Sequence, residues 1–187
     1  GVSIDVISVE PEAVSQMSPL TAGMEERVRD AVAEFLERVE NGSSDQNSSL
    51  TYIVTSYGRD DTTGILYCVC EQTVNRRSLV DFRAVFAVSD GKVVGMSGSW
   101  CFASTDGIYS AQLLDQINIL YSVRNRILEE RGNATDSREE ILSLEIGYAV
   151  YFRSDTEGFY LIPAWIVQTG SGKTYSINAV DGTLYTK

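Results

Sequence analysis

Residues 170–174, Gly-Ser-Gly-Lys-Thr, are of the types that cradle phosphate in nucleotide-binding loops. Such a loop also needs a glycine five positions before its Gly-Lys pair, and Val167 occupies that position. It further needs a following helix whose N-terminal amides face the phosphate, whereas residues 175–177 have the composition of a strand. The segment is therefore interpreted as a hairpin turn and not as a nucleotide site.

Oxygen-bearing side chains at Asp60, Asp61, Thr62 and Thr63 could act as ligands to Ca²⁺. Calcium loops alternate their ligands along the chain and add a bidentate glutamate, and this stretch has neither feature. Aspartate and threonine are also common in solvated turns, where they bond to nearby backbone groups. A turn is the favoured interpretation, and no metal-ligating residue is predicted.

Acid–base and nucleophilic catalysis lack their usual residues in this chain. Histidine, the commonest general base and metal ligand, is absent from the sequence. No serine lies in a Gly-x-Ser-x-Gly elbow, and Asp136 and Glu139 have the spacing of a helix capping box. The sequence therefore predicts a protein that is not an enzyme, with no catalytic and no cofactor-binding residues.

The chain has three cysteines, at positions 68, 70 and 101. On a strand, Cys68 and Cys70 would point to the same face, at a separation unsuited to a bond between them. Either could form a disulfide with Cys101, which would leave one free thiol. The favoured alternative is that all three are small, buried, apolar residues.

Composition indicates a folded protein of one domain or two small ones, with 187 residues, 43% hydrophobic and 22% charged. The formal net charge of −11 argues against nucleic acid or an anionic membrane surface as partner, since both would repel this chain. Its apolar runs are shorter than the roughly 18–20 residues that a membrane helix requires, so no membrane insertion is expected.

Two amphipathic helices must position these residues. The first is predicted to start at Ser18, an N-cap followed by Pro19, and to stop at Asn41-Gly42. The second is predicted over residues 109–130, with apolar residues recurring at the helical period. Its apolar face is expected to comprise Leu113, Leu114, Ile117, Leu120, Tyr121, Val123, Ile127 and Leu128.

Strand-like segments follow each helix and are separated by turn residues. The first group comprises residues 50–57, 65–74, 80–88 and 93–97, with Asp90-Gly91 as a hairpin signal. The second group comprises residues 141–152, 159–168, 174–179 and 183–185, and its last turn is Val180-Asp181-Gly182.

This order predicts an α+β fold in which two long amphipathic helices each pack on an antiparallel β-meander. We interpret residues 1–100 and 101–187 as two strand-helix-meander units, related as a tandem repeat. The alternative is one continuous domain, with a single sheet and both helices on one face.

Residues 160–167 contain the features most suggestive of a binding surface. Pro163 within a strand pattern indicates an edge, a strand start or a bulge, because proline cannot donate to the ladder. Trp165 could anchor a partner or could complete the core over the second helix. With the neighbouring tyrosines, the candidate partner contacts are Trp165, Pro163, Tyr148 and Tyr160.

The segment 144–182 resembles the C-terminal pattern of the YycI/YycH-type extracytoplasmic regulatory proteins of Gram-positive bacteria. The resemblance rests on the Gly147-Tyr148 strand, the Pro-x-Trp strand at Pro163 and Trp165, and the closing turn at 178–182. Similar meanders occur in PepSY-like domains and in lipoproteins of gut Firmicutes.

The resemblance implies a membrane-tethered or lipid-anchored domain outside the cytoplasm, which binds other proteins and regulates a sensor kinase or a cell-envelope process. Because the chain opens with Gly1 and not Met, we expect an upstream signal or anchor segment to be missing. Two alternatives remain: a ligand-binding or enzymatic domain with a pocket between helix and sheet, and a PepSY-like protease inhibitor.

Overall fold

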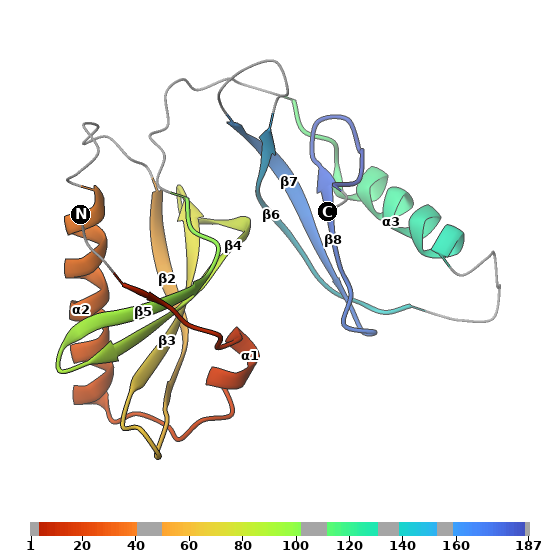
Figure 1. Ribbon diagram of the computed structural model, residues 1–187. Coiled ribbons are helices and arrows are strands. Elements are labelled where there is room, and N and C mark those ends of the chain that lie inside the picture. Colours follow the sequence, from red (N-terminus) through yellow and green to blue (C-terminus); the bar gives the residue numbers. More distant parts are fainter. Residues whose placement is uncertain (1–3, 41–49, 102–111, 131–138, 153–158, 186–187) are drawn as a thin grey trace. The chain divides into compact units, whose positions relative to one another are not determined.

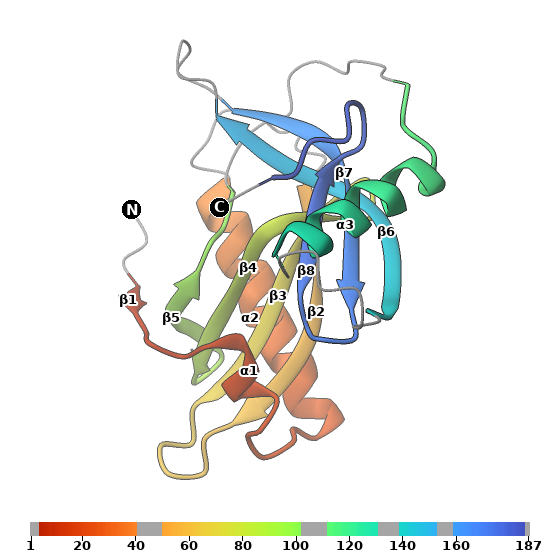
Figure 2. The ribbon, with the colours of Figure 1, turned by 90° about the vertical axis from the view of Figure 1, so that its right-hand side faces the viewer.

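The computed structural model describes residues 4–40, 50–101, 112–130, 139–152 and 159–185. The chain divides into two compact units. Unit 1 comprises residues 1–76 and 81–106, and unit 2 comprises residues 77–80 and 107–187. Figures 1 and 2 together label the helices and strands of both units.

Unit 1 contains most of the strands. They run in the order β1-β5-β4-β3-β2, and β1 pairs with β5 in parallel, whereas β2–β3 and β4–β5 are antiparallel. The strands are β1 Asp5–Val6, β2 Leu50–Arg59, β3 Leu66–Val74, β4 Arg77–Ser89 and β5 Lys92–Gly98, and the helices are α1 Pro11–Val14 and α2 Ala22–Glu40. The first residues of β4, 77–80, belong to unit 2.

The sheet of unit 1 is buried on both faces. On one face, Val32 and Phe35 of α2 pack against Cys70 and Phe86 in the core of the unit. The opposite face is covered by α1, through Val14 and its neighbours (Figure 1). Because β3 and β4 have a helix on each side, their residues are apolar almost without alternation.

Unit 2 is a smaller sheet with one helix. Its elements are α3 Gln116–Glu130, β6 Ile141–Phe152, β7 Phe159–Thr169 and β8 Thr174–Asn178. The strands β6, β7 and β8 are antiparallel neighbours, and Leu79 at the start of β4 pairs with Tyr148 of β6 in parallel. Figure 2 shows α3 lying across one face of this sheet, where Ile119, Val123 and Ile127 are buried.

The predicted hairpins are present. Residues 50–57 and 65–74 lie in β2 and β3, and the second predicted pair lies in β4 and β5. Asp90 and Gly91 have φ values of 49° and 72°, both in the left-handed region that a two-residue hairpin requires. After the second helix, the segment predicted over 183–185 contributes a single bridge, between Leu184 and Ile177.

The predicted fold class is wrong. The described residues are mainly strand, with eight strands in a mixed sheet and three helices, of which the longest has 19 residues. They are not two long helices that each pack on an antiparallel meander, and the tandem-repeat interpretation fails with that prediction. The physical reason is that the parallel β1–β5 and β4–β6 pairings join residues far apart in sequence, which local periodicity does not encode.

The first predicted helix starts too early. The helix α2 begins at Ala22, and the Thr21 carbonyl accepts the amide of Glu25 at 3.0 Å. Ser18 is not the N-cap, because its hydroxyl donates to Asp61 and its carbonyl accepts the Arg59 amide. The stop predicted at residues 41–42 lies outside the described residues.

The second predicted helix is also too long. The helix α3 begins at Gln116, after Asp115, whose carboxylate accepts the Asn118 amide at 2.9 Å as an N-cap does. The preceding residue, Leu114, donates its amide to Ala179 at 2.7 Å instead of joining the helix. Residues 109–111 lie outside the described residues.

The described ranges contain neither a membrane-spanning helix nor a cluster of metal-ligating side chains. Among those residues, no helix is long and apolar enough to cross a membrane. Within the same ranges, no three or more Cys, Asp or Glu side chains gather where they could hold a metal ion.

Candidate functional site

Trp165, the first of the predicted partner contacts, serves the packing of α3. It is half-buried against the core formed by α3, β7 and β8. Its indole Nε1 donates to the Leu114 carbonyl at 3.2 Å, just before α3 begins. Since the Leu114 amide is bonded to Ala179, the backbone on both sides of this residue is fixed to the sheet. Trp165 therefore helps to set where α3 starts.

Pro163 and Tyr148 lie directly opposite each other on β7 and β6. The Pro163 carbonyl accepts the Ala179 amide at 2.9 Å. Because the nitrogen and the carbonyl of one strand residue point to the same side, the Pro163 nitrogen also faces the β8 side. The last residue pair of the β7–β8 ladder is Ala164 with Asn178, so Pro163 lies one residue outside this ladder. Proline is tolerated inside this central strand because the missing amide lies beyond the end of that ladder.

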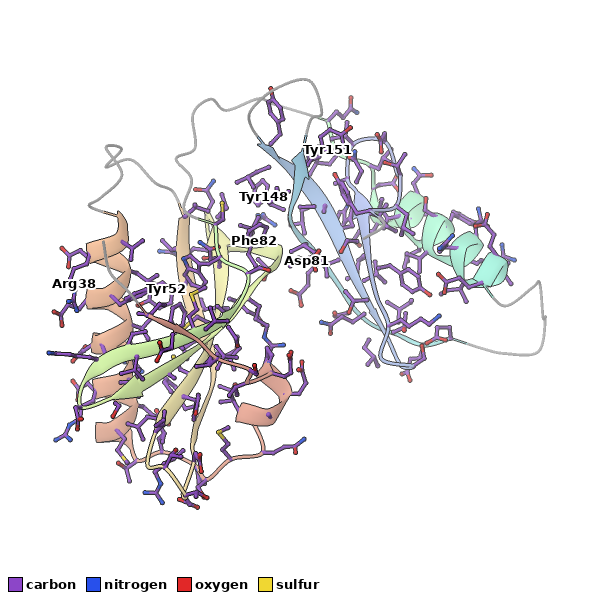
Figure 3. All side chains as sticks on the ribbon, viewed as in Figure 1. Arg38, Tyr52, Asp81, Phe82, Tyr148 and Tyr151 are labelled. Carbon is purple, nitrogen blue, oxygen red and sulfur yellow. The ribbon has the colours of Figure 1, made fainter. Side chains whose placement is uncertain are left out.

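Tyr160 lies farther along the strand, directly opposite Tyr151 of β6, and both side chains are exposed. Tyr148 and Tyr151 are both visible on β6 in Figure 3. Because successive strand residues point to opposite faces, Tyr160 is on the other face of the sheet from Pro163 and Trp165. The four predicted contacts therefore do not form one surface.

The helix α3 presents a second apolar surface that the sequence prediction misplaced. Ile117, Leu120 and Tyr121, which we name the outer stripe, are 67%, 38% and 61% exposed. The residues that pack on the sheet are Ile119, Val123 and Ile127. Five of these six residues were predicted to lie on one buried face, and Ile119 was not included in that prediction.

The helical period explains this arrangement. At 100° per residue, Ile117 and Tyr121 point well away from the direction of Val123, so one helix face cannot contain all the apolar residues. A wheel of α3 drawn from the sequence would have shown two apolar directions. The outer stripe is thus an exposed apolar surface that sequence reasoning missed, although its signal was present.

The polar surroundings of the outer stripe are sparse. No charged side chain occurs in α3 before Arg124, which lies one turn beyond Tyr121 and is exposed. In the described part of the chain Arg124 forms no ion pair, whereas Arg126 is paired with Glu130 at 2.9 Å. The stripe therefore ends at one unpaired positive charge in a chain whose net charge is −11.

The two candidate ligand loops are turns. Asp60 accepts the Thr62 amide and the Thr63 hydroxyl, both at 2.8 Å, and these bonds lower the pKa of its carboxyl. In the other loop, Gly172 donates its amide to the Thr169 carbonyl at 2.9 Å and has a φ of 82°. Both loops therefore use their polar groups to bond to themselves, as the turn interpretations predict.

The three cysteines are buried free thiols, which confirms the favoured interpretation over a disulfide. The sulfur atoms of Cys68 and Cys70 lie 3.8 Å apart on the face of β3 that α2 covers.

Comparison with protein-family models gives no match, and no curated protein has a significantly similar sequence.

Proposed function

We propose that this protein is a non-catalytic module that binds a partner protein through the outer stripe of α3. The observation that carries the proposal is a helix with two apolar sides, one buried against its own sheet and one exposed. A surface helix of a self-sufficient domain has a polar outer face, because exposed apolar area is unfavourable in water. Contiguous exposed apolar residues are typical of interaction sites.

The stripe fits an apolar groove on a partner protein. Ile117, Leu120 and Tyr121 have the i, i+3, i+4 spacing by which one helix lies in the groove of another protein. Tyrosine is also frequent among residues that dominate binding energy. Arg124 at the end of the stripe would be complemented by an acidic residue at the rim of that groove.

The start of α3 is anchored by Trp165, which supports the proposed binding surface. Trp165, Leu114 and Ala179 join the beginning of the helix to β7 and to the turn after β8. A helix held in this way presents its outer residues in a fixed geometry, which reduces the conformational entropy lost on binding. On this proposal Trp165 and Pro163 position the contact surface, and Tyr160 belongs to the other face of the sheet.

The resemblance of residues 144–182 to YycI/YycH-type proteins is the basis for proposing where the module acts. We propose that it acts outside the cytoplasm, as a membrane-tethered or lipid-anchored regulator of a sensor kinase or of a cell-envelope process. The charge of −11 supports a protein partner over nucleic acid.

A double variant tests the surface. Ile117→Glu with Tyr121→Glu should retain the thermal stability of the wild type, because both side chains are exposed. A partner isolated with the wild-type protein and then purified should bind the double variant at least about tenfold more weakly by calorimetry, since losing one interface anchor costs about 1.4 kcal/mol or more.

Ile53→Glu is the matched control, because Ile53 is an equally apolar, half-exposed residue on β2 of unit 1. It should bind the purified partner as the wild type does. Equal binding by all three proteins would contradict the proposed surface. Concentration-dependent dimerisation that the double variant abolishes, measured by ultracentrifugation without any partner, would replace the partner protein by a second copy.

A further inference from the structure

A pocket of about 320 Å³ lies in unit 2, between the end of α3 and β8. Its wall consists of Glu130 from α3, residues 173–176 (Lys-Thr-Tyr-Ser), and Leu184 and Tyr185. Its volume is at the lower end of the range found for small-ligand pockets. None of these residues belongs to the outer stripe.

Glu130 organises the polar side of the pocket. One carboxylate oxygen accepts the Lys173 ammonium at 2.7 Å and the Tyr175 hydroxyl at 3.1 Å. The other oxygen accepts Arg126 Nε at 2.9 Å. Three donors, one each from α3, the turn before β8 and β8 itself, therefore converge on this carboxylate. The hydrogen bond from Lys173 lowers the pKa of the Glu130 carboxyl, which therefore stays an ionised acceptor.

Tyr185 lines the same pocket and carries an unsatisfied polar group. Its hydroxyl oxygen is buried and has no hydrogen-bond partner, while its amide donates to the Ser176 carbonyl at 2.8 Å. A buried hydroxyl without a partner is costly, and such groups call for a specific explanation. Burial raises the pKa of Tyr185 to about 12, so its hydroxyl remains a donor at neutral pH.

The charges of the pocket favour a neutral ligand. The negative charge of Glu130 is paired with Lys173, so neither ion is available in isolation. An anion would approach a chain of net charge −11, and a cation would have to compete with Lys173 and Arg126 for the carboxylate. Hydroxyl groups, which donate and accept at once, can join such a network without displacing either charge.

The remaining wall suits the carbon skeleton of the same ligand. Leu184 and the tyrosine rings supply apolar surface beside the polar groups, and Ser176 and Thr174 add hydroxyls. Pockets of this kind combine an apolar lining with a few polar groups that set orientation. We infer that the pocket binds a small, neutral, polyhydroxylated ligand such as a saccharide unit, whose hydroxyls reach Glu130 and Tyr185. This inference is independent of the protein-binding function proposed for α3.

Amide NMR titration of the whole chain tests the inference. The probes are D-glucose, N-acetyl-D-glucosamine and myo-inositol, each added to about 50 mM, which detects affinities into the millimolar range. With at least one probe, the amides of residues 173–176 and 184–185 should shift saturably. Citrate, as an anionic probe of similar size, should not produce saturable shifts at these residues.

Tyr185→Phe and Glu130→Gln are the diagnostic variants, and Tyr151→Phe is the control on an exposed tyrosine of β6. The first two should weaken binding of the active probe about fivefold or more, because Tyr185→Phe removes a hydroxyl and Glu130→Gln replaces a charged acceptor oxygen by an NH2 donor, while both keep side-chain shape. The control should bind as the wild type does. Tyr185→Phe should also be at least as stable as the wild type, since it removes an unsatisfied hydroxyl.

Three results would overturn the inference. One is the absence of saturable shifts at the pocket with all three neutral probes. Another is binding that neither diagnostic variant weakens, which would place the ligand elsewhere. Saturable binding of citrate alone would likewise reject the neutral class.

Discussion

The side chain of Gln72 holds the backbone of Cys101 with two hydrogen bonds. Gln72 Nε2 donates to the Cys101 carbonyl at 2.7 Å, and the Cys101 amide donates to Gln72 Oε1 at 2.6 Å. Both residues are buried. The glutamine thus does for the Cys101 backbone what a neighbouring strand would do, since it bonds both the amide and the carbonyl of a buried residue.

Gln72→Leu should therefore destabilise the protein by about 2–4 kcal/mol, because it removes both buried hydrogen bonds between this side chain and the Cys101 backbone. The free energy of unfolding from urea titration measures this loss. Gln168→Leu is the control, since Gln168 is exposed on β7 and should change stability little. A loss below about 0.5 kcal/mol in Gln72→Leu would show that the two bonds are not needed.

The buried cysteines should be chemically inert in the folded protein. The hydrogen bond to Cys68 and the burial of the thiol raise the pKa of Cys70, so this group stays protonated at neutral pH. A maleimide reagent should label none of the three cysteines quickly in native buffer, and should label all three in urea. Rapid native labelling, followed by mass spectrometry, would contradict the buried positions of Cys68, Cys70 and Cys101.

Local patterns in the sequence predicted the hairpins. They did not predict the parallel strand pairings, which depend on contacts between residues far apart in the sequence. Asp90-Gly91 encodes its own turn, because both residues must have positive φ. By contrast, β1 has two residues and no period, and its pairing with β5 depends on residues about ninety positions away, as in Asp5 with Gly95. A helical wheel of α3 separates the outer stripe from the buried residues, but the prediction placed Ile117, Leu120 and Tyr121 on the buried face.

The pocket residues were unpredictable for a similar reason. Glu130 and Tyr175 are 45 positions apart, and their contact exists because the end of α3 lies over β8. Lys173 belongs to the Gly-Ser-Gly-Lys-Thr turn, whose residue types are those of a phosphate loop, whereas in the structure it pairs with Glu130. The spacing of residues in the sequence does not indicate that Lys173 pairs with Glu130, because the two are 43 positions apart.

Acid should weaken the loop between β2 and β3 through Asp61. The hydroxyl of Ser18 and the guanidinium of Arg59 lower the pKa of this carboxyl in the folded state. A lowered folded-state pKa stabilises the protein above the ordinary pKa of about 3.9, and that contribution is lost as pH falls through the lowered value.

Asp61→Asn should consequently lose less stability than the wild type between about pH 5 and pH 2. Urea unfolding at several pH values measures the two slopes. Asp30→Asn, on the exposed side of α2, serves as control and should leave the acid dependence as in the wild type. An unchanged slope in Asp61→Asn would mean that its bonds to Ser18 and Arg59 do not form in solution.

Two glycines should respond to alanine in opposite ways. A Cβ atom at Gly58 would lie 2.5 Å from the Val14 carbonyl and 2.7 Å from Met17 Cβ, so α1 would have to move off the sheet. Gly58→Ala should cost about 1–3 kcal/mol of unfolding free energy. A Cβ at Gly23, within α2, meets nothing within 4 Å, and Gly23→Ala should stabilise by about 0.5–1 kcal/mol because alanine favours the helix. Urea titration of both variants measures this difference in sign, and equal effects would contradict the close packing of α1 on β2.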